Sequence, residues 1–213
     1  MNFFRQIAIK PWLSDQRPAN VIHPGMASRE ATTKRGLWLF LFVVTALFAL
    51  MSVAYLENTT LAQWTPLREP RLLWLNSAIL VFSSITIHWA RNLAAKNMLS
   101  QARRVLIAST VLAVAFLFGQ MFAWLELLEY GYFASVNPSY AFYYMMTALH
   151  GLHIFGGVTV LIFALDRAFR KDDEEAMIRT IQLCATYWHY LLMIWVVLFA
   201  MMLMDNGTII DKI

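Results

Sequence analysis

The sequence has few charged residues and a single cysteine. Asp, Glu, Lys and Arg make up 14% of the 213 residues, against about a quarter in soluble domains, while 60% are hydrophobic. This composition excludes a disordered chain and a basic polymer that wraps nucleic acid, and it argues against a soluble globule. The lone cysteine, Cys184, excludes an internal disulfide and a cysteine-based metal cage built by this chain alone. Glycine-rich phosphate loops and nucleophile elbows are also absent from the sequence.

Long apolar runs stand where a soluble chain would have charge. A helix needs about 20 largely apolar residues to cross a bilayer, and five runs reach that length. They are Leu37–Leu56, Leu72–Ala90, Val105–Leu127, Tyr140–Leu165 and Ile181–Met204. We therefore predict an all-α membrane protein whose five transmembrane helices form a bundle. The predicted organisation is an N-terminal tail at residues 1–36, a transmembrane domain at 37–204 and a C-terminal tail at 205–213.

The basic residues outside these runs predict the orientation of the chain. When tails and loops are assigned alternately to the two sides, 14 of the 17 Lys and Arg residues fall on the side of the N-terminus and 3 on the other. Segments on the cytoplasmic side of a membrane carry the excess of Lys and Arg. We therefore expect a cytoplasmic N-terminus and a C-terminus on the outer side.

Ionisable residues inside the runs are few, and they are candidates for function because they are costly in lipid. His88 lies near the cytoplasmic end of the second run, where we expect its side chain to reach the membrane interface. Glu126 lies at the end of the third run and is expected at the outer interface. Gln120 and the polar residues of Ser83–Thr86 are predicted to form hydrogen bonds between helices.

Three histidines in the last two runs allow two interpretations. His150 and His153 are spaced i, i+3 and lie on one helix face, while His189 is expected at a similar depth and could meet His153 if the two helices are neighbours. Such imidazoles could bind copper, iron or a haem. Alternatively, each histidine donates a hydrogen bond to a neighbour and fixes helix packing. We favour this second interpretation because the inner spans offer no carboxylate to complete a non-haem metal site.

Several segments resemble subunit III of the haem–copper terminal oxidases. They are Gln120–Glu126 (QMFAWLE), Phe142–His153 (FYYMMTALHGLH), Tyr187–Trp195 (YWHYLLMIW) and, less specifically, Leu80–Thr86 (LVFSSIT). These segments follow the family's order and spacing through four of the five runs. The start of the first run, Gly36–Leu41, is similar as well.

The resemblance implies a five-helix, non-catalytic subunit III of a respiratory oxidase of the cytochrome c type, in the bacterial inner membrane with its C-terminus in the periplasm. Such a subunit holds no haem or copper; both belong to the catalytic subunit I, against which it packs. It is expected to bind phospholipid, to protect the oxidase from inactivation during turnover and to support proton uptake. A respiratory supercomplex is left open as a partner by the departures described next. The positions that the resemblance marks as structural or lipid-contacting are Gln120, Trp124, Glu126, His150, His153, Trp188 and His189.

Three positions depart from the family's pattern. The family has membrane-embedded acids where this chain has Val44, Ala123 and Leu192. Roles in proton handling that belong to those acids therefore do not transfer to this chain. The departures indicate a divergent branch, and they leave open a quinol oxidase, an accessory subunit of a nitric oxide reductase, or a haem- or metal-binding protein that uses the three histidines.

Overall fold

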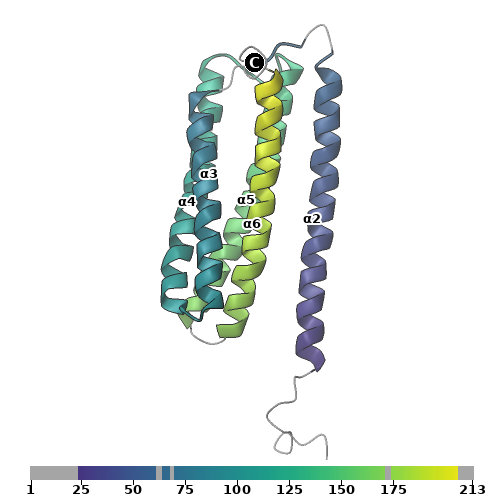
Figure 1. Ribbon diagram of the computed structural model, residues 1–213. Coiled ribbons are helices and arrows are strands. Elements are labelled where there is room, and N and C mark those ends of the chain that lie inside the picture. Colours follow the sequence, from purple (N-terminus) through teal and green to yellow (C-terminus); the bar gives the residue numbers. More distant parts are fainter. Residues whose placement is uncertain (1–23, 61–63, 68–69, 171–173, 206–213) are drawn as a thin grey trace, which may run out of the picture. The chain divides into compact units, whose positions relative to one another are not determined.

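The computed structural model describes residues 24–60, 64–67, 70–170 and 174–205, and the regular structure in these ranges is entirely helical (Figure 1). The helices are α2 (Pro24–Asn58), α3 (Arg71–Ala95), α4 (Leu99–Glu129), α5 (Pro138–Arg170) and α6 (Glu174–Asp205). Each of these five contains a segment long and apolar enough to cross a membrane. Within the described ranges, the predicted all-α fold is confirmed, and its five helices are long and apolar enough for the predicted membrane spans.

The helices extend past the predicted apolar runs. α3 continues to Ala95 and α2 already begins at Pro24. A chain that leaves the hydrocarbon keeps its backbone hydrogen bonds by remaining helical, and proline is favoured in the first turn because no N–H is needed there. The chain divides into two units, residues 1–39 and residues 40–213. The second unit contains α2 from Phe40 onward together with α3–α6.

Helices α3–α6 run side by side, and each contacts two others of the four (Figure 1). The contacting pairs are α3 with α4, α4 with α5, α5 with α6, and α6 with α3. The core that these helices share contains small buried residues: Ala90 and Ala94 on α3, and Ala102 and Ala113 on α4. Such residues let helix backbones approach closely, which matters in lipid because packing rather than water drives helix association.

A three-residue turn joins α3 to α4. Asn97 adopts a left-handed backbone conformation with φ of 56°, which asparagine tolerates better than most residues. The N–H of Met98 donates to the Leu93 carbonyl oxygen at 3.0 Å and so satisfies a free carbonyl at the end of α3. Because the turn is this short, α3 and α4 must be antiparallel neighbours.

From Phe40 onward, α2 buries a single stripe of side chains at spacings of three and four residues. Its members are Leu41, Val44, Phe48, Met51 and Tyr55. The stripe packs against residues of α5 and α6, among them Met146 and Ile194. Most of the remaining surface of this part of α2 is exposed and apolar, as expected of a helix at the periphery of a membrane protein.

Serine hydroxyls connect α3 to two of its neighbours. The hydroxyls of Ser83 and Ser109 each donate to the other's carbonyl oxygen at 3.2 Å, which links α3 to α4. From α6, Trp188 Nε1 donates to Ser83 Oγ at 3.1 Å, and Trp195 Nε1 donates to Ser77 Oγ at 2.9 Å. The prediction of interhelical hydrogen bonds is therefore confirmed for Ser83. It is wrong for Thr86, whose hydroxyl donates to the Ser83 carbonyl oxygen within α3.

Candidate functional site

A polar layer crosses the interior between α3, α4 and α5. Gln120 on α4 accepts from Asn76 Nδ2 at 3.4 Å and donates through Nε2 to the Tyr143 hydroxyl at 3.3 Å. All three side chains are buried. The predicted interhelical role of Gln120 is thus confirmed. The sequence analysis missed its partners, Asn76 and Tyr143. Asn76 could have been found, because an asparagine inside an apolar run is itself a sign of an interhelical hydrogen bond.

Trp124 and Thr147 extend this layer toward the end of α4. Trp124 Nε1 donates to Thr147 Oγ1 at 3.1 Å, and Thr147 in turn donates to the Tyr143 carbonyl oxygen at 2.7 Å. The indole therefore connects α4 to α5 and satisfies its own N–H. The structural role that the resemblance implies for Trp124 stays a prediction, with which this contact agrees.

Asn76 is enclosed tightly. A Cβ atom at Gly119 would overlap the Asn76 amide oxygen, so the side chain of Asn76 lies directly on the α4 backbone. Within the described residues this amide oxygen has no hydrogen-bond partner. The contact to Gln120 is therefore the one that holds the Asn76 side chain in the polar layer.

His150 lies in an aromatic enclosure. Its ring centroid is 5.0 Å from that of Trp195, 6.0 Å from Phe116 and 6.4 Å from Phe48, and the side chain is fully buried. Neither ring nitrogen has a hydrogen-bond partner in the described part of the chain. The expectation that His150 donates a hydrogen bond to a neighbour is therefore wrong: ring packing, rather than hydrogen bonding, holds it.

His153 and His189 both bond back to their own helices. Nδ1 of His153 donates to the Leu149 carbonyl oxygen at 2.7 Å, and Nδ1 of His189 donates to the Ala185 carbonyl oxygen. The tie between α5 and α6 at this depth comes instead from Tyr187, whose hydroxyl donates to the His153 carbonyl oxygen at 2.9 Å. The prediction that these two imidazoles donate to a neighbouring helix is thus wrong, because each donates within its own helix.

The three histidines do not gather into one site. His189 lies beside His88 of α3, with ring centroids 5.5 Å apart, whereas His153 contacts Phe48 at 5.6 Å. Tyr187, which reaches His153, and His189 are two residues apart on α6 and so project to nearly opposite sides of it. Within the described ranges, no three His, Cys, Asp or Glu side chains are placed to hold a metal ion.

Trp188 occupies the closest approach of α5 and α6. The side chain is buried, and its Cζ3 atom would lie 2.8 Å from a Cβ built at Gly157. Glycine at this position therefore gives the indole the room in which it reaches Ser83. Trp188 is a packing residue that joins α3, α5 and α6.

A hydroxyl pair lies in the seam between α2 and α6. The hydroxyls of Thr45 and Tyr190 lie 2.7 Å apart, and the Leu41 carbonyl oxygen lies within hydrogen-bond distance of both, at 2.8 Å and 3.2 Å, so the two hydroxyl hydrogens are shared among three contacts. The neighbouring Val44 is buried among apolar side chains. The position where the resembled family has an acid thus lies in apolar packing here.

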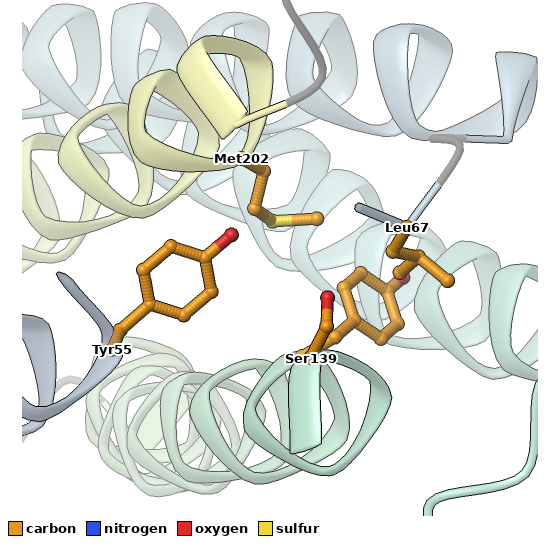
Figure 2. Close-up of a pocket in the computed structure, with 5 residues that line it drawn as sticks. Tyr55, Leu67, Ser139 and Met202 are labelled. Carbon is orange, nitrogen blue, oxygen red and sulfur yellow. The ribbon is translucent and has the colours of Figure 1, made fainter. Parts of the chain in front are cut away.

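A small cavity lies between α2, α5 and α6. Figure 2 shows its lining, with the Tyr55 ring and the Ser139 hydroxyl facing the enclosed space. The lining residues are Tyr55, Leu67, Ser139, Tyr143 and Met202. Its volume of about 10 Å³ is the room of roughly one water molecule. An organic substrate does not fit into it.

Treatment with a carbodiimide is expected to label the membrane spans of this chain weakly at neutral pH. The reagent attacks protonated carboxyl groups held in apolar surroundings. Val44, Ala123 and Leu192 cannot react, and Glu126 is half-buried one turn from the end of α4, within reach of water. Peptide mass spectrometry after labelling measures this, with E126Q as the control. Strong labelling of Glu126 that E126Q abolishes would contradict its interfacial placement.

Comparisons with a family model and with individual known proteins point to the same family. The model of the family described as cytochrome c oxidase subunit III matches residues 26–205. Cytochrome c oxidase subunit 3 of Thermostichus vulcanus is 29% identical over 172 residues, which cover 78% of this chain and 84% of that protein. The protein of the same name from Synechocystis sp. is 28% identical over 170 residues (77% and 72%). A probable cytochrome c oxidase subunit 3 of Nocardia farcinica is 29% identical over 171 residues (77% and 82%).

Proposed function

The chain belongs to the cytochrome c oxidase subunit III family, and from this premise we propose that it is the non-catalytic subunit that stabilises the catalytic subunit of an oxygen-reducing terminal oxidase. The observation that carries the proposal is the extent of the family match, which runs from the first turn of α2 to the end of α6. The relatives carry the name of cytochrome c oxidase subunits. The alternatives of a quinol oxidase, a nitric oxide reductase accessory subunit or a haem- or metal-binding protein are accordingly not favoured.

The chemistry of the interior supports a structural role. Its polar groups bond between helices or back to their own helix, and His150 is surrounded by aromatic rings. The histidines do not fit a haem or copper site, because His189 points from α6 toward His88 on α3, whereas the side of α6 that faces His153 carries Tyr187. Haem and copper then belong to catalytic subunit I, and the partners of this chain are subunit I and the other oxidase subunits. The proposal also includes bound phospholipid and membership of a respiratory supercomplex.

Deleting this subunit is expected to leave the haem spectrum of the oxidase unchanged while activity decays faster during turnover. The reason is that this chain supplies packing and not ligands. Optical spectra, metal analysis and progress curves of the purified oxidase, with and without the subunit, measure both effects. Re-expression of the intact chain is the control and should restore the slow decay. Loss of a stoichiometric haem or copper on deletion would overturn the proposal.

We further propose the inner membrane of a bacterium as the location, with the N-terminus in the cytoplasm and the C-terminus in the periplasm. The distribution of Lys and Arg supports this orientation. A reporter fused after Ile213 is expected to read periplasmic, and one inserted within Lys171–Glu175 cytoplasmic. Paired reporters that are active only on one side of the membrane make the measurement. The reverse pattern would refute the orientation and leave the family assignment untouched.

A further inference from the structure

The small cavity between α2, α5 and α6 lies where α2 and α6 end and α5 begins (Figure 2). Tyr55 lies three residues before the end of α2, Ser139 is the second residue of α5, and Met202 lies three residues before the end of α6. Three residues of a helix span about 5 Å. The cavity therefore lies near the edge of the hydrocarbon, where water from outside the membrane has a short way to travel.

The size and the lining of the cavity suit a water molecule. The volume of about 10 Å³ is the room of one water. Two lining residues, Leu67 and Met202, are apolar, while Tyr55, Ser139 and Tyr143 carry hydroxyl groups. A cavity lined by hydrocarbon alone stays dry, whereas one that offers two to four polar partners holds water. With three hydroxyl-bearing residues in its lining, this cavity belongs to the second kind.

The Ser139 hydroxyl faces the cavity and needs a partner. Ser139 is buried, and its backbone N–H donates to Asn137 Oδ1 at 2.9 Å, so the start of α5 is capped without the hydroxyl. No residue in the described part of the chain bonds to Ser139 Oγ, and Figure 2 shows this atom facing the enclosed space. A buried hydroxyl without a hydrogen bond is costly, so Ser139 gains from a partner inside the cavity.

Tyr143 brings the polar layer to the wall of the cavity. Its hydroxyl oxygen accepts from Gln120 Nε2 at 3.3 Å, and the residue lines the cavity one helical turn past Ser139. A phenol that accepts a hydrogen bond still has its own hydrogen to donate, and no described residue accepts it. The row of bonds from Asn76 through Gln120 thus ends on a donor that needs an acceptor.

A third hydroxyl comes from α2. In Figure 2 the Tyr55 side chain extends from its helix into the space between Met202 and Ser139. The phenolic oxygen has lone pairs that accept a hydrogen bond whatever partner its own hydrogen has. A molecule that both accepts and donates hydrogen bonds can therefore connect α2 to α5 through this cavity.

We propose that one ordered water molecule occupies this cavity, where it accepts the hydrogen of Tyr143 and donates to the oxygens of Ser139 and Tyr55. Three bonds are the usual number for a buried water. The water extends the polar layer from α5 to α2, so that a hydrogen-bonded row runs from Asn76 on α3 to the last turn of α2. It thereby fastens the end of a peripheral helix to the rest of the bundle. This inference stands on the cavity and is independent of the proposed function.

X-ray radiolytic footprinting of the full chain in nanodiscs tests the proposal. X-rays split water into hydroxyl radicals, and a radical that arises from a bound water oxidises the nearest reactive side chain in place. Met202 lines the cavity and is 8% exposed, whereas Met51 is 9% exposed and does not line it. Met204, which is 59% exposed, reports radicals from bulk water. A radical scavenger dissolved in the bulk water separates the two sources.

With the scavenger present, methionine sulfoxide at Met204 should fall strongly, while Met202 should keep most of its oxidation and exceed Met51 several-fold. The variant S139V replaces the hydroxyl with two methyl groups that take up the room of the water, so it should lower Met202 to the level of Met51. Oxidation of Met202 that falls in step with Met204, or that S139V leaves unchanged, would overturn the proposal. Should S139V fail to fold, the comparison of the three methionines in the wild type decides by itself.

Discussion

Replacing Gly157 with leucine is expected to force α5 and α6 apart and to destabilise the chain by about 3 kcal/mol, the upper range for overpacking a core. A Cβ at this position would lie 2.8 Å from Trp188 and 3.0 Å from Tyr187. Neither ring can move freely, because Trp188 bonds to Ser83 and Tyr187 bonds to the His153 carbonyl oxygen. Leucine therefore disturbs the packing of α5 against α6 and the bond from α6 to α3 together.

The adjacent glycine provides the matched control for this prediction. Gly156 is exposed, and a Cβ built there meets nothing within 4 Å. G156L adds the same side chain to the same helix and gains the same helix propensity without a clash, so it should be at least as stable as the wild type. Thermal or denaturant unfolding in detergent compares the two variants. Equal stability of G157L and G156L would show that the close approach of α5 and α6 is not required.

Breaking the Asn76–Gln120 pair is expected to show strong non-additivity. Q120M leaves the Asn76 amide buried with no partner at all, which costs about 1–3 kcal/mol. N76L has the same consequence for the Gln120 amide oxygen. The double variant N76L/Q120M replaces both polar groups with apolar groups of similar shape, so it should cost clearly less than the sum of the two single changes.

Unfolding of the four proteins in one detergent completes this double-mutant cycle. The tight contact of Asn76 with Gly119 makes the shape of the replacement important, and leucine matches the branched shape of asparagine. If the stability losses of the two single variants add up to the loss of the double variant, the two amides contribute independently. The hydrogen bond of 3.4 Å between them would then add nothing to stability.

The helices and their number could be predicted from the sequence because apolar runs of this length have few alternatives in lipid. The polar layer could be predicted only in part. Gln120 stood out as an amide inside a span, but its bond to Asn76, 44 residues away, could not be derived without knowing how α3 packs on α4. The i, i+3 spacing correctly placed His150 and His153 on one helix face, where both rings contact Phe48.

The partners of the histidines needed the tertiary structure. Similar depth suggested that His153 and His189 meet, yet the rotation of α6 about its own axis, which sequence spacing does not fix, turns His189 toward His88. Likewise, the rings of Phe48, Phe116 and Trp195 come from three different helices, so the enclosure of His150 has no local signature. Local spacing shows which residues share a face, but not which helix that face meets.

The α3–α4 hairpin has a consequence for biogenesis. Its turn takes only three residues, and the paired bonds between Ser83 and Ser109 are made wholly within these two helices. Chains are synthesised from the N-terminus at about 5–20 residues per second, so these bonds can form before α6 leaves the ribosome. Trp188 then reaches a Ser83 hydroxyl whose position is already fixed. The last helix to be made thus closes onto a template that the earlier helices have completed.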